Sequence, residues 1–346
     1  MRKFITPIAI LLLALCGCSS SSTNSASSTN NSAQTREFFA MDTFMSVKAY
    51  GVTSDSVLEE TESEVKRLEK LLSVTDTESD IYKINSNSGT AVQVSDDTVQ
   101  LINKANDVSV KTNGATDISI YPVLKEWGFT TGEYKVPDES TLEELFTNVD
   151  YTKIQVENNT VTIPEGYAID LGSIAKGYTG DKIIELLKEN GVSSALVNLG
   201  GNVQTLGSKP DGSKWSVAIK NPTDQESQIC IVKVRDKAVV TSGSYERYFT
   251  ADDGNRYWHI LDPETGKPAD NGLISVTIIG DSGTLCDSLS TSLFVMGTEK
   301  AIDYAKQNTD IDVILVTDEM EIFITEDIAD SVEMLNNYSY SLISHS

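Results

Sequence analysis

Histidine, cysteine and positive charge are scarce in this chain, and each scarcity excludes a class of site. The 346 residues include two histidines and four cysteines, so a zinc site built from these side chains is not expected. Acidic residues outnumber basic ones by 51 to 27, and the resulting net charge of −24 argues against nucleic acid as a partner. A bound metal should therefore be a hard cation held by oxygen ligands, such as magnesium.

Long hydrophobic runs are also missing. Arg2 and Lys3 precede an apolar run that begins at Phe4 and lasts about a dozen residues, whereas a membrane-spanning helix needs about 20. This pattern predicts a lipoprotein signal peptide over residues 1–17, with a lipobox before Cys18. Lipid on Cys18 would anchor the protein to the extracytoplasmic face of the bacterial cell membrane. A signal peptide cleaved without lipidation is the alternative.

The rest of the chain divides by composition. Residues 18–35 are rich in Ser, Thr and Asn without apolar periodicity, which predicts a disordered tether. We expect one folded domain over 36–335 and a C-terminal tail over 336–346. The chain is 39% hydrophobic, enough for a large core or two lobes. Cys230 and Cys286 can form one disulfide in an exported protein, or can stay unpaired.

Helical and strand patterns follow one another in mixed order, which favours an α+β fold with antiparallel sheet. Apolar residues at helical spacing mark amphipathic helices. The predicted helices cover 55–72, 98–112, 140–146, a segment ending near 190, 284–297 and 298–307. The predicted strands cover 38–50, 194–198, 215–219, 230–234, 238–242, 257–261, 274–279, 313–316 and 321–324, with a hairpin around 158–159.

The helix predicted over 284–297 carries the clearest chemical signal. Asp287 and Thr291 are four residues apart, so they share one helical face. A carboxylate and a hydroxyl stacked in this way can both point at one hard cation. The alternative is that Asp287 is only an N-cap and Thr291 an ordinary surface hydroxyl.

Two glycine-containing segments suit phosphate or a close backbone approach. Gly172 and Ser173 are predicted to lie at a helix N-terminus, where backbone N–H groups favour phosphate. The segment is not a Walker A loop, because Tyr178 and Thr179 occupy the positions that Lys and Ser/Thr require. The turn over 199–202 lacks the Gly-x-Gly-x-x-Gly pattern of a Rossmann nucleotide site.

Seven short motifs occur in a fixed order along the chain. They are Met41-Asp-Thr43, Gly114-x-x-Asp117, Asp170-Leu-Gly-Ser-Ile-Ala-Lys-Gly177, Asn198-Leu-Gly-Gly201, Thr241-Ser-Gly-Ser244, His259-Ile-Leu-Asp262-Pro-x-Thr-Gly266 and Asp287-Ser-Leu-Ser-Thr291. Together they resemble the ApbE family of FAD:protein FMN transferases over about residues 38–325. The resemblance implies a two-lobed α+β fold with mixed and antiparallel sheets, related to the tunnelling fold, with FAD in the cleft.

The same resemblance implies an activity and a set of site residues. The implied reaction transfers FMN from FAD to a Thr or Ser hydroxyl of an exported FMN-binding acceptor flavoprotein. A phosphoester forms, AMP is released, and the reaction depends on Mg²⁺. By motif, the metal ligands are Asp287, Thr291 and the backbone carbonyl of Ser173, and His259 lies at the catalytic centre. The residues expected along the FAD are Met41, Ala115, Thr116, Asp117, Asp170 and Lys176. Many relatives carry Gly where this chain has Asp42.

Several alternatives stay open at this point. His259 is the only histidine in the predicted domain and suits a general base, but a lone histidine is often structural. Asp262 can cap the turn that follows it. The same site can serve a Mg²⁺-dependent FAD diphosphatase, with water in place of the acceptor hydroxyl. A non-catalytic flavin-binding lipoprotein and a structural surface lipoprotein are the remaining hypotheses.

Overall fold

A nine-stranded sheet organises the fold in the computed structural model, which describes residues 32–51 and 54–345. The signal peptide, Cys18 and most of the predicted tether lie outside the described residues. In spatial order the sheet consists of β1 (Ala33–Ala40), β2 (Thr43–Tyr50), β6 (Ser194–Leu199), β7 (Asn202–Leu206), β10 (Ala238–Gly243), β13 (Leu273–Gly280), β14 (Ile311–Thr317), β15 (Ile322–Thr325) and β17 (Ser341–Ile343). Neighbouring strands pair antiparallel except β15 and β17, which are parallel. The sheet is therefore mixed and mainly antiparallel, as predicted.

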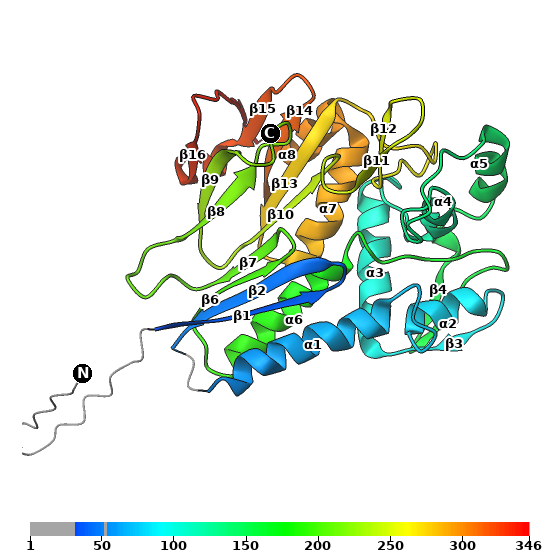
Figure 1. The fold of residues 1–346 in the computed structure, drawn as a ribbon, viewed down its shortest axis with the longest axis horizontal. Helices are drawn as coiled ribbons and strands as arrows, with labels where there is room; N and C mark the ends of the chain where they lie inside the picture. The colour runs from blue at the N-terminus through cyan, green and yellow to red at the C-terminus, as the bar shows by residue number, and fades with distance from the viewer. Residues whose placement is uncertain (1–31, 52–53, 346) are drawn as a thin grey trace, which may run out of the picture.

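Helices cover one face of this sheet (Figure 1). The described helices are α1 (Ser56–Leu72), α2 (Asp80–Ser86), α3 (Asp96–Lys111), α4 (Tyr121–Glu126), α5 (Glu139–Phe146), α6 (Ala175–Glu189), α7 (Gly283–Met296) and α8 (Thr298–Gln307). Of these, α1, α6, α7 and α8 contact strands of the large sheet. Short 3₁₀ segments are η1 (Ile118–Ile120), η2 (Tyr151–Lys153) and η3 (Glu326–Ser331). Helix α7 packs on β10 and β13, while α6 packs on β6 and β7. The two helices that carry the phosphate and metal motifs therefore lie side by side.

A three-stranded sheet covers part of the other face. It consists of β8 (Trp215–Lys220), β9 (Gln228–Val234) and β16 (Val332–Met334). Cys230 belongs to the apolar core between the two sheets, whereas Cys286 belongs to the core on the helical side. Because the large sheet separates them, both cysteines are free and buried, and no disulfide joins them.

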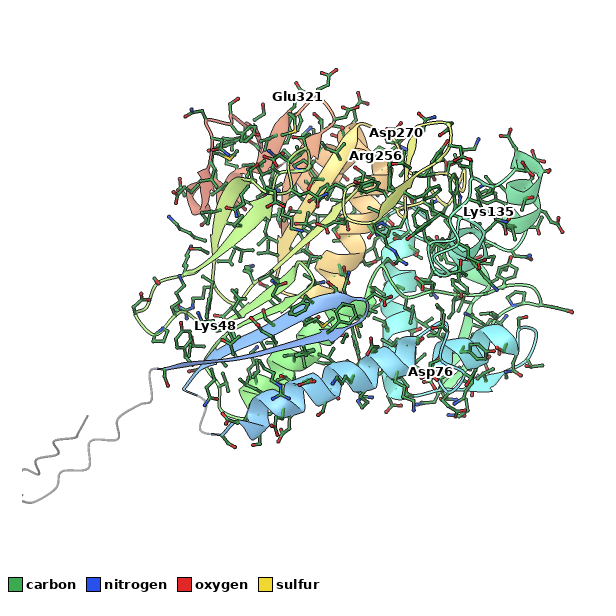
Figure 2. The ribbon with its side chains drawn as sticks, in the orientation of Figure 1. Lys48, Asp76, Lys135, Arg256, Asp270 and Glu321 are labelled. Atoms are coloured by element: carbon green, nitrogen blue, oxygen red, sulfur yellow. The ribbon has the colours of Figure 1, made fainter. Side chains whose placement is uncertain are left out.

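The second lobe lies to one side of the sheet (Figure 1). It contains α2 to α5 and a small sheet of β3 (Val92–Gln93), β5 (Thr160–Thr162) and β4 (Gln155–Glu157). The hairpin of β11 (Tyr248–Thr250) and β12 (Arg256–Trp258) adds an aromatic cluster around the buried Trp127. Exposed charged side chains such as Lys135, Asp270 and Glu321 project from the periphery of the molecule (Figure 2).

Some boundaries differ from the sequence-based expectations. The predicted strand over 38–50 is a hairpin, because Met41 and Asp42 adopt φ of 47° and 58° and form a two-residue turn. Such left-handed conformations suit the primed turns of tight hairpins, and Asp tolerates them better than most residues. Strand β1 begins inside the predicted tether, and β17 lies inside the predicted C-terminal tail. None of the described helices is long and apolar enough to span a membrane.

Candidate active site

The site is built on a very close crossing of α6 and α7. A Cβ on Gly177 would lie 2.1 Å from the carbonyl oxygen of Gly283 and 2.6 Å from Cβ of Asp287, so only glycine fits there. This approach lets the backbone N–H of Gly177 donate to Oδ2 of Asp287 at 2.7 Å. Gln204 closes the crossing by donating from Nε2 to the Gly177 carbonyl at 2.9 Å. The Asp287 carboxyl is thus buried and fixed in orientation.

The N-terminus of α7 is capped by residues other than Asp287. Ser282 is the N-cap and accepts from the Leu285 N–H. Asp181 on α6 accepts from the backbone N–H groups of Gly283 and Thr284 at 2.7 and 2.9 Å. The hypothesis that Asp287 serves only as an N-cap is therefore excluded. Sequence reasoning missed Asp181, although it lies one helical turn after Gly177 and so faces the same neighbour.

The hydroxyl of Thr291 ends a directed chain of hydrogen bonds. Ser290 donates to the Asp287 carbonyl at 2.8 Å, so its single proton is used. Ser242 must then donate to Ser290 at 2.7 Å, and Thr291 in turn must donate to Ser242 across a longer contact of 3.4 Å. This order leaves the oxygen lone pairs of Thr291 free. A hydroxyl whose proton is already engaged is suited to bind a cation through its oxygen.

A cation bound beside Asp287 would stabilise the ionised form of this buried carboxyl. Burial raises the pKa of Asp287 from 3.8 to about 6, against the opposing charge of Lys176. Asn202 is buried beside it: its side-chain amide lies close enough to the carboxylate to lower the pKa, whereas its Oδ1 has no hydrogen-bond partner among the described residues. Unsatisfied buried polar groups are rare in folded proteins and often mark the place of a ligand, ion or water.

The described residues contain no cluster of three or more His, Cys, Asp or Glu side chains that could hold a metal. The predicted ligand set would escape such a test, because it has one carboxylate, one hydroxyl and one backbone carbonyl. These donor types suit a hard cation that keeps several waters or phosphate oxygens as its other ligands.

One cavity of about 870 Å³ brings the predicted residues together. This volume lies within the range of small-molecule and cofactor sites. The predicted residues that line it are Met41, Thr116, Asp117, Asp170, Ser173, Lys176, His259, Asp287 and Thr291. Ala115 does not line the cavity and packs against the apolar core around α7. The adjacent Thr116, which is also predicted along the FAD, does line the cavity, and its hydroxyl lies 2.6 Å from that of Ser292.

Two carboxylates of the cavity wall also hold the backbone. Asp117 caps η1 by accepting from the Ser119 N–H at 2.7 Å and also accepts from the Tyr151 N–H at 2.8 Å. Asp170 accepts from the Gly172 N–H at 2.8 Å. Burial raises the pKa of both carboxyls. Each residue therefore shapes the loop that carries it, besides facing the cavity.

His259 is held in one tautomer. Its Nδ1 lies 3.1 Å from the carbonyl oxygen of Arg247, and since a carbonyl can only accept, Nδ1 carries the proton. Nε2 then keeps a lone pair. Desolvation by the surrounding protein, followed by the positive charges of Arg247 and Lys176, lowers the pKa of the half-buried His259 to about 4. The imidazole is therefore neutral at pH 7 and able to accept a proton. Arg247, which sets this tautomer, was not found from sequence.

The family model described as the ApbE family matches residues 41–315. The chain belongs to the ApbE family. The FAD:protein FMN transferase of Klebsiella pneumoniae (strain 342) is 37% identical over 266 residues, which cover 75% of this chain and 82% of that protein. The FAD:protein FMN transferase of Treponema pallidum (strain Nichols) is 32% identical and covers 95% of this chain and 96% of its own length.

Solved ApbE structures share the fold. The crystal structure of the ApbE protein from Thermotoga maritima superposes with a TM-score of 0.82 at 31% identity, covering 87% of this chain and 99% of that chain. The apo form of the Pseudomonas stutzeri flavinyl transferase ApbE gives a TM-score of 0.75 at 31% identity, covering 83% and 91%. The predicted α+β ApbE fold is confirmed.

Proposed function

We propose that this chain transfers FMN from FAD to a Thr or Ser hydroxyl of an acceptor protein. Its ApbE relatives are named for FMN transfer from FAD to protein. The observation that carries the proposal is the cavity itself. It joins a fixed buried carboxylate, a hydroxyl with free lone pairs and a neutral histidine in a space of about 870 Å³. These are the parts that transfer of a phosphoryl group to a hydroxyl needs.

Magnesium fits the donor set. Asp287, the Thr291 hydroxyl oxygen and the Ser173 carbonyl would hold the ion, and the buried Asn202 Oδ1 near Asp287, which has no hydrogen-bond partner among the described residues, supports a ligand there. A bound Mg²⁺ would supply charge neutralisation of the diphosphate. Lys176 adds a positive charge on the first turn of α6, where backbone N–H groups also favour phosphate oxygens.

His259 accounts for the proton. The acceptor oxygen attacks the phosphorus that bears the riboflavin, and the bond between this phosphorus and the bridging oxygen breaks. AMP leaves with the bonding electron pair, while the proton of the attacking hydroxyl passes to Nε2 of His259. The Arg247 carbonyl keeps Nδ1 protonated, so Nε2 is the atom available for this step. Met41, Thr116 and Asp170 form other parts of the wall against the substrate.

The cellular setting follows from the N-terminal sequence. We propose a lipid anchor at Cys18, location on the extracytoplasmic face of the bacterial cell membrane, and an exported FMN-binding flavoprotein as acceptor. Cys18→Ala should move the protein from the membrane fraction to the soluble fraction. Unchanged membrane association of this variant contradicts lipidation at Cys18.

The reaction can be tested with the domain from residue 32 onward. It is incubated with FAD and Mg²⁺, with and without an exported FMN-binding domain, and nucleotides and denatured proteins are then separated. The proposal predicts AMP release together with flavin fluorescence that stays on the denatured acceptor, and loss of both signals with EDTA. Free FMN and AMP without labelling identify a diphosphatase, and intact FAD in both reactions contradicts an enzymatic function.

A further inference from the structure

Two aromatic side chains are left exposed at the tip of the β1–β2 hairpin. Phe39 and Phe44 are 62% and 70% exposed, and they lie directly opposite each other in the strand register. Their neighbours Phe38 and Met45 point to the other face of the hairpin and are buried. Alternation along both strands therefore places the two phenylalanine rings together on the uncovered face.

Such a pair has no folding role that the described contacts reveal. Neither ring belongs to an apolar core or to an aromatic contact within the described residues. Neighbouring exposed aromatic residues are typical of protein-binding surfaces, where aromatic anchors carry much of the affinity.

The pair is continuous with the active site. Phe44 and the turn residues Met41 and Asp42 line the cavity, so the hairpin tip forms part of its rim. If the protein transfers FMN to another protein, the acceptor hydroxyl must reach the diphosphate inside this cavity. The polypeptide on either side of that hydroxyl must then cross the rim.

We propose that the Phe39–Phe44 pair is a docking surface for the acceptor segment that carries the modified hydroxyl. The inference rests on the proposed function. The segment that fits is extended, with an apolar side chain a few residues from the Thr or Ser. Strand β1 also ends the large sheet, so its outer edge has no strand partner in the described part of the chain. An extended segment can add to such an edge through backbone hydrogen bonds.

The position of the pair indicates that its binding partner is the acceptor protein and not the membrane surface. The chain leads from the proposed anchor to Ala33, at the opposite end of β1 from the hairpin turn. Eight residues of strand separate the ends of β1 by roughly 25 Å. The aromatic pair thus lies at the cavity and away from the end that continues toward Cys18.

Phe39→Thr is the test variant, because Thr suits a strand and Phe39 does not line the cavity. Leu342→Thr on β17 is a matched control: it is 52% exposed and lies at the other end of the same sheet. Transfer is followed at varied acceptor concentration and saturating FAD. We expect the KM for the acceptor to rise about tenfold in Phe39→Thr. The dissociation constant for FAD should not change, and both constants should stay at wild-type values in Leu342→Thr.

A photo-crosslinking phenylalanine analogue at position 39 gives a second test that keeps the ring. Its crosslink should map within a few residues of the flavinylated hydroxyl of the acceptor. An unchanged KM in Phe39→Thr, or a crosslink far from that hydroxyl, overturns the proposal. Unchanged KM with reduced binding to anionic lipid vesicles, or with altered self-association, assigns the pair to those roles instead. If the wild-type protein labels no acceptor at all, the proposed function itself fails.

Discussion

Replacing Asp287 with Asn separates two effects of this carboxylate: its buried charge lowers the stability of the metal-free protein, and its oxygen is proposed to bind the metal. In the metal-free protein burial raises the pKa of this carboxyl from 3.8 to about 6, so its ionised form destabilises the folded state. The shift corresponds to about 3 kcal/mol once the group is fully ionised. Asn has nearly the same shape and can still accept the Gly177 N–H, so the variant should lose the charge penalty without creating a cavity.

The sign of the effect depends on pH. A group whose pKa is raised by folding stabilises the folded state at low pH, and this contribution is lost as pH rises through the folded pKa. The metal-free Asn variant should therefore be more stable than wild type by up to about 3 kcal/mol at pH 8, and by about half as much at pH 5. Urea unfolding with EDTA at both pH values measures this difference.

Magnesium should reverse the order. A ligand that binds only the folded state stabilises it by an amount that grows with ligand concentration. We expect Mg²⁺ with FAD to raise the unfolding midpoint of wild type and to leave that of Asp287→Asn nearly unchanged. Equal stabilisation of both proteins by Mg²⁺ refutes Asp287 as a ligand, and a metal-free variant less stable than wild type at pH 8 refutes the buried-charge argument.

Three further outcomes follow from single contacts. Ser242→Ala removes the acceptor that orients the Thr291 hydroxyl, so Mn²⁺ binding measured by electron paramagnetic resonance should weaken several-fold, whereas Ser292→Ala should leave it unchanged. Gly177→Ala forces α6 and α7 apart, so chemical denaturation should show a free energy of unfolding at least about 2 kcal/mol lower than that of wild type. A variant with wild-type stability contradicts the close crossing of the two helices. His259 has a pKa of about 4, so kcat/KM should show no protonation step near pH 6.5. A step there that His259→Gln abolishes contradicts a neutral imidazole.

The sequence was informative where chemistry depends on spacing along one element. Asp287 and Thr291 share a face because they are four residues apart on one helix, and mixed element order predicted the α+β class. Contacts between elements that are distant in sequence could not be predicted from residue spacing. Asp181 reaches α7 only because two glycines let α6 approach it, and the direction of the Thr291 hydroxyl depends on Ser242 from a different strand.

Turns and chain ends were the other weak points. Met41 and Asp42 lack the Asn-Gly or Asp-Gly pattern of a two-residue turn, so the hairpin looked like one strand. The sequence did not predict β17, because the strand has only three residues and so shows no clear apolar alternation. It forms by pairing in parallel with β15, a contact between segments that are separated in sequence. Motif position predicts Ala115 along FAD; in the structure it packs against the core around α7 and does not line the cavity.

The intact mass of the acceptor tests the central claim most directly. After incubation with the enzyme, FAD and Mg²⁺, the acceptor should gain the mass of FMN less one water, and fragmentation should place the gain on a single Thr or Ser. The gain should be absent with Asp287→Ala. An acceptor of unchanged mass, with FAD nevertheless converted to FMN and AMP, contradicts protein flavinylation by this site.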